Sequence, residues 1–187
     1  RDLHSFPTRR SSDLHIGSFD DRVGSAALLL ALKHLDAKKL EHEVIFVWSV
    51  REEVGLEGAR AVAAALGTRP VRVYAIDTFV SADAPLERQT YAVARLGQGA
   101  VARALDQSSV TSPAHVDSLV QLARARKIAL QVGTTSGGND GSVFLPYGVA
   151  DIPIGWPLRY SHSPAEVMDL KDLVALADIV QAIAEAW

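Results

Sequence analysis

The sequence contains no cysteine, so disulfide bridges, thiolate metal sites and a cysteine nucleophile are all excluded. Any metal ion must therefore be held by histidine, aspartate and glutamate. Long apolar runs are also missing, because the longest one spans only residues 26–32, whereas a membrane-spanning helix needs about 20 residues. The net charge of −3 offers no basic surface to nucleic acid or to an anionic membrane. We therefore expect a cytoplasmic protein with no nucleic-acid or membrane partner.

The composition predicts a single folded domain of medium size. The chain has 187 residues, of which 48% are hydrophobic and 22% are charged, and this balance argues against intrinsic disorder. The first 14 residues differ from the rest, because they are rich in serine and arginine and match the translation of a common short-read sequencing adapter. We therefore expect residues 1–14 to be an artefactual or disordered segment and residues 15–187 to fold.

Strand-like and helix-like segments alternate along the rest of the chain. β-Branched and aromatic residues predict strands at residues 43–50, 71–76, 128–132 and 152–156. Periodic apolar residues predict helices at residues 21–35 and 58–66, a helix starting at Ser112 and Pro113, and a last helix capped by Asp169. Residues 81–98 show no periodicity and are expected to form loops. This alternation predicts an α/β fold with an open, mostly parallel sheet and helices on both faces.

Acidic and imidazole side chains occur where such a sheet forms its sites. In open α/β sheets, ligands bind beyond the carboxyl ends of the strands. The residues found there are Asp20, before the first helix; Glu52 and Glu53, after the strand at 43–50; Asp77, after the strand at 71–76; and His162, after the last strand. We therefore expect these side chains to meet at one edge of the sheet.

Taken one at a time, these residues are also typical of ordinary surface features. Adjacent glutamates are common in solvated loops, an aspartate before a helix is common as its cap, and a histidine between serines is common in exposed loops. Together they would concentrate negative charge in a small space, which is tolerated mainly when divalent cations neutralise it. A carboxylate shared by two metals about 3.5–4 Å apart is the recurring arrangement of dimetal hydrolases.

Five short motifs carry these residues. They are DDRVG at 20–24, REEVGLEGA at 51–59, AIDT at 75–78, GGND at 137–140 and PLRYSHSPAEVMD at 157–169. Together, and in this order, they resemble the tetrahedral aminopeptidase family over the chain from Phe19 to its C-terminus. Members of that family are co-catalytic dimetal aminopeptidases, also called cellulase-like or glutamyl aminopeptidases. The resemblance implies a phosphorylase/hydrolase-like zinc-peptidase fold, here incomplete.

The resemblance also implies a role for each candidate residue. The family removes N-terminal residues from peptides through a metal-bridged water, and Glu52 corresponds to its general base and acid. Two divalent ions, zinc or cobalt, would be held by four metal ligands of this chain. The implied ligands are Asp20, which bridges both ions and is followed by a cis peptide bond; Glu53 and His162, which complete one ion; and Asp77, which binds the other.

The sequence departs from the family pattern in three ways. The family's upstream His-x-Asp motif has no counterpart, since His15 lies on the wrong segment, and the β-rich domain that precedes DDRVG is missing as well. Asn139 stands where the family usually has threonine. We therefore expect the C-terminal part of a catalytic domain, which is weakly active or inactive and prone to aggregate by itself, and which forms homo-oligomers when full length.

Two other functions remain open from the sequence. One is another dimetal hydrolase, such as a deacylase or a glycosidase, and a glycosidase would use two carboxylates across a sugar cleft without metal. The other is a non-catalytic assembly subunit that retains a relic metal site. Removal of metal by a chelator and substitution of Glu52 distinguish these alternatives.

Overall fold

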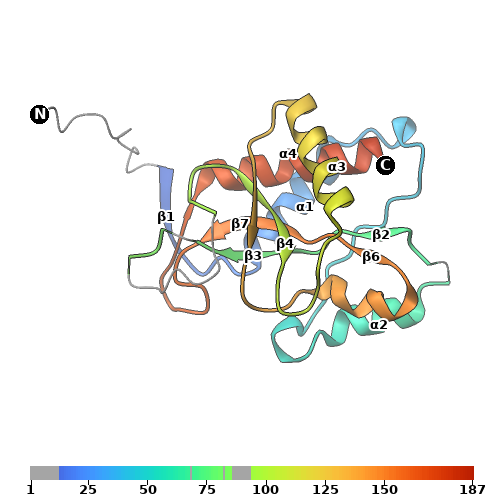
Figure 1. Cartoon of the computed structure of the whole chain (residues 1–187), viewed down its shortest axis with the longest axis horizontal. Coiled ribbons are helices and arrows are strands. Elements are labelled where there is room, and N and C mark those ends of the chain that lie inside the picture. The colour runs from blue at the N-terminus through green and yellow to red at the C-terminus, as the bar shows by residue number, and fades with distance from the viewer. Residues whose placement is uncertain (1–12, 68, 82, 86–93) are drawn as a thin grey trace, which may run out of the picture.

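The computed structural model describes residues 13–67, 69–81, 83–85 and 94–187 (Figure 1). Apart from residues 13 and 14, the segment predicted to be artefactual lies outside the described residues. Part of the loop region expected at 81–98 also lies outside them. The described part of that region contains no helix or strand, so the prediction of loops is confirmed there.

A central sheet of four strands organises the molecule. In spatial order its strands are β3 (Ile76–Val80), β7 (Ile154–Leu158), β4 (Ala100–Leu105) and β5 (Leu130–Thr134). The β3–β7 and β4–β5 pairs are parallel, and β4 and β7 pair antiparallel. A further parallel pair joins β2 (Arg72–Val73) to β6 (Ala150–Asp151). The prediction of a mostly parallel sheet in an α/β fold is confirmed.

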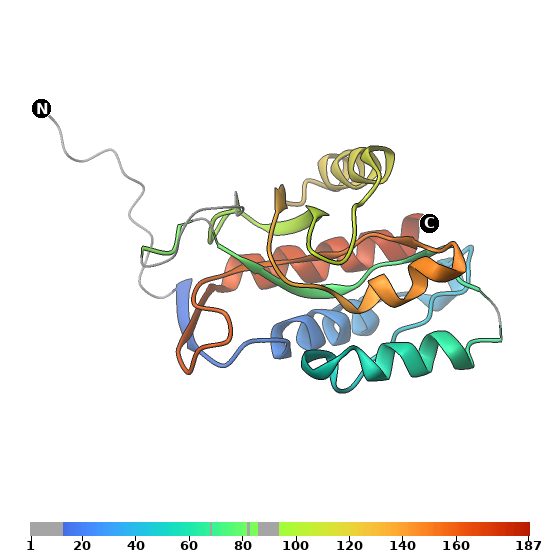
Figure 2. The same ribbon diagram turned by 60° about the horizontal axis from the view of Figure 1, so that its bottom comes forward.

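The helices lie around this sheet, and α3 and α2 are on opposite sides of it (Figures 1 and 2). The α-helices are α1 (Arg22–His34), α2 (Glu57–Ala65), α3 (Pro113–Arg126) and α4 (Leu170–Ala186). The short 3₁₀ helices are η2 (Ala37–Lys39), η3 (Glu52–Val54) and η4 (Asp140–Tyr147). Both predicted caps are confirmed, because Ser112 accepts from the His115 amide and Asp169 from the Lys171 amide. None of the helices in the described residues combines the length and apolarity needed to cross a membrane.

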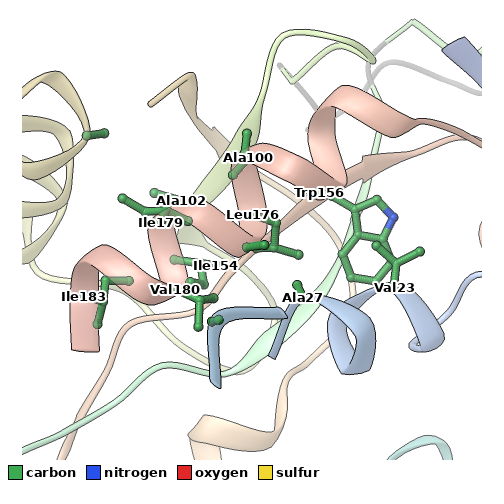
Figure 3. Packing of buried hydrophobic residues seen from close by; sticks show 14 of the residues in the cluster. Val23, Ala27, Ala100, Ala102, Ile154, Trp156, Leu176, Ile179, Val180 and Ile183 are labelled. Carbon is green, nitrogen blue, oxygen red and sulfur yellow. The ribbon is translucent and has the colours of Figure 1, made fainter. Parts of the chain in front are cut away.

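The main core lies between the central sheet and α1, α3 and α4. Alternate residues of β7 point into it, so Ile154, Trp156 and Leu158 are fully buried. Leu176 and Ile179 of α4 pack against them, and Figure 3 shows these side chains meeting those of α1. Each fully buried side chain of this size contributes about 1.5–3 kcal/mol. The core therefore fixes the start of α1 and the end of β7 relative to each other.

A short antiparallel pair joins distant parts of the chain beside this core. β1 (Leu14–Gly17) pairs with β8 (Glu166–Asp169), and Gly17 is the partner of Glu166. The pairing places the segment just before α1 next to the segment just before α4. Neither strand was expected from the sequence, because four-residue strands carry too few side chains for a periodic pattern.

The prediction of a buried strand at 43–50 is wrong. This segment forms neither a helix nor a strand, and Ile45, Trp48 and Val50 are exposed. β-Branched and aromatic residues favour a pleated surface that packs against neighbours. Without a neighbour in the described part of the chain, the composition alone does not make a strand.

The strand predicted at 71–76 continues further than expected. After β2 the chain resumes in β3, and Asp77 is the partner of Gly155 in β7 and not a residue beyond the strand end. The reason is that β7 extends to Leu158 and provides a parallel partner for the whole of β3. The sequence also missed β4, because its alanines and single arginine give no β-branched pattern.

Candidate metal centre

Asp20 lies in the turn between β1 and α1, immediately before the paired carboxylate Asp21. The peptide bond between them is cis, as the resemblance implies. The carboxylate of Asp21 lies against Gly24, where a Cβ atom would be only 2.4 Å from Asp21 Oδ1. Glycine at this position of DDRVG therefore leaves the room that the Asp21 side chain needs.

Glu52 and Glu53 lie in η3, a single 3₁₀ turn between segment 43–50 and α2. Arg51 before the turn and Gly55 after it both adopt left-handed backbone conformations, with φ of 61° and 116°. The two glutamates therefore lie in a tight turn that follows segment 43–50. Glycine adopts this conformation without a steric penalty, which explains its place at the end of the turn.

His162 brings two of these acidic segments together. Its Nε2 atom lies 3.3 Å from Asp20 Oδ2 and 3.3 Å from Glu53 Oε2. One ligand atom from each of the three residues lies within 4.8 Å of the other two. The imidazole is 69% exposed, so the cluster is open to solvent. The structure thus gathers three of the four residues predicted to be metal ligands, from three separate parts of the chain.

The fourth predicted ligand, Asp77, lies beside this cluster but is bonded to other groups. Its Oδ2 accepts from the Arg103 guanidinium at 2.5 Å, and its Oδ1 accepts from the Thr78 amide at 2.6 Å. Burial raises the pKa of Asp77, although Arg103 opposes this shift. Asp77 in turn raises the pKa of Asp20 and Glu52, so its charge acts on the cluster.

Arg103 is a central residue of the site that the sequence analysis did not identify. Its side chain is 1% exposed, and besides Asp77 it donates to the Gly138 carbonyl at 3.0 Å and pairs with Asp106 at 3.2 Å. Asn139 donates to the same Asp106 carboxylate at 2.9 Å. The side chain of Asn139 therefore links the GGND loop, of which it is part, to Asp106. The signal that could have revealed Arg103 is a lone arginine within the apolar strand AVARAL.

Several carboxyl groups of the site have raised pKa values, so without a bound cation they are not all ionised at neutral pH. Burial, reinforced by Asp77 and Glu53, raises the pKa of Asp20 to about 6. Burial and the charge of Asp77 also raise the pKa of Glu52 to about 7 and that of Asp21 to about 9. Opposite charge placed among these carboxylates would lower their pKa values again.

We therefore expect the chain to lose stability as the pH rises when a chelator removes divalent ions. A carboxyl group whose pKa is higher in the folded than in the unfolded state stabilises the fold below the unfolded value, and this stability is lost as the pH rises through the folded value. For Asp20 the window runs from about pH 4 to 6, with a slope of up to about 1.4 kcal/mol per pH unit. Urea unfolding across this window measures the effect.

The matched variants for this experiment are Asp20→Asn and Asp117→Asn. The first removes the titrating group, so its stability should fall less steeply between pH 4 and 6 than that of the parent chain. The second alters an exposed aspartate of α3 and should follow the parent curve. Parallel curves for the parent and Asp20→Asn would contradict the assignment.

The donor set of the cluster fits a divalent cation. One imidazole nitrogen and two carboxylate oxygens are ligands that zinc and similar ions accept. The surplus of acidic groups around them is the charge that such an ion neutralises. The fold and the site together define an α/β protein with a candidate metal centre of the hydrolase type.

Comparison with known proteins identifies the family. The sequence model of the M42 glutamyl aminopeptidase family matches residues 7–179, and the chain therefore belongs to this family. It is 32% identical over 173 residues to the lysyl aminopeptidase of Pyrococcus furiosus, covering 89% of this chain and 46% of that protein.

Two solved structures are similar as well. An aminopeptidase from the archaeon Desulfurococcus kamchatkensis matches 96% of this chain and 51% of its own, with a TM-score of 0.85 and 33% identity. The TET1 peptidase of Pyrococcus horikoshii, which can assemble into a tetrahedron or a large octahedral shell, matches 90% of this chain and 49% of its own. Its TM-score is 0.81 and its identity 34%. The chain spans about half the length of the curated relatives it matches.

Proposed function

We propose that this chain carries the catalytic carboxylate and most of the metal ligands of a metal-dependent aminopeptidase that removes N-terminal residues from peptides. The observation that carries the proposal is the cluster of Asp20, Glu53 and His162 in a member of the M42 family. The named relatives support the same activity, since the relative from Pyrococcus furiosus is a lysyl aminopeptidase.

Each side chain has a definite task in this proposal. Asp20, Glu53 and His162 would hold one divalent ion, zinc or cobalt, and Asp20 and Asp77 would contribute to a second. Ions bound there would supply Lewis acidity. Glu52 takes a proton from the attacking water and delivers it to the leaving amine.

The assembly and the location are part of the same proposal. The tetrahedral or octahedral shells of the TET1 peptidase support a homo-oligomer for the full-length protein. The 187-residue chain by itself is expected to be weakly active or inactive, because the resemblance places a further histidine ligand in an upstream motif. The cytoplasmic location stays a prediction.

The alternative functions give different results in simple assays. A glycosidase with two carboxylates needs no metal, so it would keep its activity in a chelator. A deacylase would prefer a peptide whose N-terminus is acylated, whereas an aminopeptidase requires a free amine. A non-catalytic subunit would bind metal but cleave neither substrate.

We expect Glu53→Ala to lose metal, because Glu53 supplies one of only three ligand groups in the cluster. The measurement is metal content by elemental analysis after incubation of the chain with zinc and removal of free ion. Glu57→Ala is the matched control, since Glu57 lies four residues away and pairs with exposed Arg51 at 3.1 Å. A Glu53→Ala chain that keeps the parent's metal content would remove Glu53 from the site.

A further inference from the structure

Glu166 lies beside the metal centre, and its carboxylate joins two of the segments that carry candidate ligands. It is the first residue of β8 and is 3% exposed. Its Oε2 accepts from the backbone amides of Phe19 and Asp20, and its Oε1 accepts from the amide of His162 at 3.1 Å. One buried carboxylate thus accepts hydrogen bonds from the backbone at both Asp20 and His162.

The backbone positions that these bonds join, Asp20 and His162, lie outside the helices and strands. His162 lies in a loop, its backbone is left-handed with φ of 60°, and its imidazole is largely exposed. Asp20 lies in the turn before α1. Hydrogen bonds from backbone amides to an ionised carboxylate are roughly twice as strong as those between neutral groups. The Glu166 carboxylate therefore fixes the separation of the two backbone positions before any ion binds.

We propose that Glu166 is a positioning residue of the metal centre, which sets the spacing between Asp20 and His162. The inference rests on the proposed function, because it assigns Glu166 to the site that binds the ion. Glu166 lies outside the cluster of three ligand groups, and its two oxygens accept from three backbone amides. It acts through Asp20 and His162, whose backbone amides donate to it.

The substitution Glu166→Gln separates this role from that of a space-filling side chain. Glutamine has nearly the same shape, but one of its two terminal atoms is an NH₂ group that cannot accept a hydrogen bond. Either the Phe19–Asp20 segment or the His162 segment must therefore lose its acceptor. Loss of a group that orients a metal ligand typically weakens metal binding by about 10–100-fold.

The experiment measures cobalt binding to the 187-residue chain by titration, using the visible absorption of the bound ion. We expect Glu166→Gln to bind cobalt about 10–100-fold more weakly than the parent and to change its absorption bands, because the ligand geometry is altered. Glu185→Gln is the matched control and should bind like the parent. Glu185 lies near the end of α4, where its carboxylate accepts from Arg126 and Gln181.

A second measurement does not depend on metal. In a chelator, hydrogen exchange at the amides of Asp20 and His162 should be faster in Glu166→Gln than in the parent, for at least one of the two. Equal cobalt affinity and equal spectra in variant and parent would overturn the positioning role, even if the variant unfolds more easily. A parent chain that binds no cobalt would overturn the proposed metal site and the positioning role with it, while the exchange data would still report whether Glu166 holds the two segments.

Discussion

Replacing Glu52 by glutamine in a protein of the family's full length should lower turnover by about 10²–10⁴-fold while the metal stays bound. Glutamine keeps the size of the side chain but can neither take a proton from water nor return it to the leaving amine. Glu52 is also outside the cluster of three ligand groups, so its loss should leave the metal content unchanged. Hydrolysis of an unblocked peptide, together with elemental analysis, measures both effects.

The control for this experiment is Glu57→Gln, a glutamate at the start of α2 whose carboxylate pairs with Arg51. It should retain the parent's turnover. If Glu52→Gln retains it as well, Glu52 has no part in the mechanism. If turnover and metal are lost together, Glu52 acts as a ligand and the roles of the two adjacent glutamates must be exchanged.

Replacing Arg103 by methionine should destabilise the chain by about 3–5 kcal/mol, because it leaves buried charge without its partner. Arg103 is enclosed in the sheet and pairs with both Asp77 and Asp106. Methionine fills a similar volume but donates no hydrogen bond, so the two carboxylates and the Gly138 carbonyl each lose a donor. Urea unfolding in a chelator, followed by tryptophan fluorescence, measures the loss.

Arg126→Met provides a matched comparison. Arg126 pairs with Glu185 at 2.9 Å at the surface, where its side chain is 47% exposed. Exposed pairs of this kind contribute about 0–1 kcal/mol, so this variant should unfold nearly as the parent does. Equal losses in the two variants would show that the buried network contributes no more than a surface pair.

The acidic cluster was predictable because its members lie in short motifs with their own local chemistry. The paired glutamates lie in a tight turn that Gly55 ends, and His162 follows the last strand of the sheet. Asp77 was expected beyond the end of a strand, but it lies inside β3 and faces Arg103. The role of Glu166 could not be predicted, because its carboxylate accepts from backbone amides. Backbone amides are alike along the chain, so the sequence does not show which of them a side chain will contact.

The α/β class, the helix caps at Ser112 and Asp169 and the kinds of side chain available to a metal could all be predicted from the sequence. These depend on neighbours in the chain, on periodicity and on the chemistry of single residues. Three features depend on the packing of the whole chain. Segment 43–50 pairs with no described strand, β4 lies inside the sheet, and the buried Arg103 binds Asp77. Such outcomes depend on which distant segments come into contact and on what solvent they exclude, and both are fixed only when the whole chain packs.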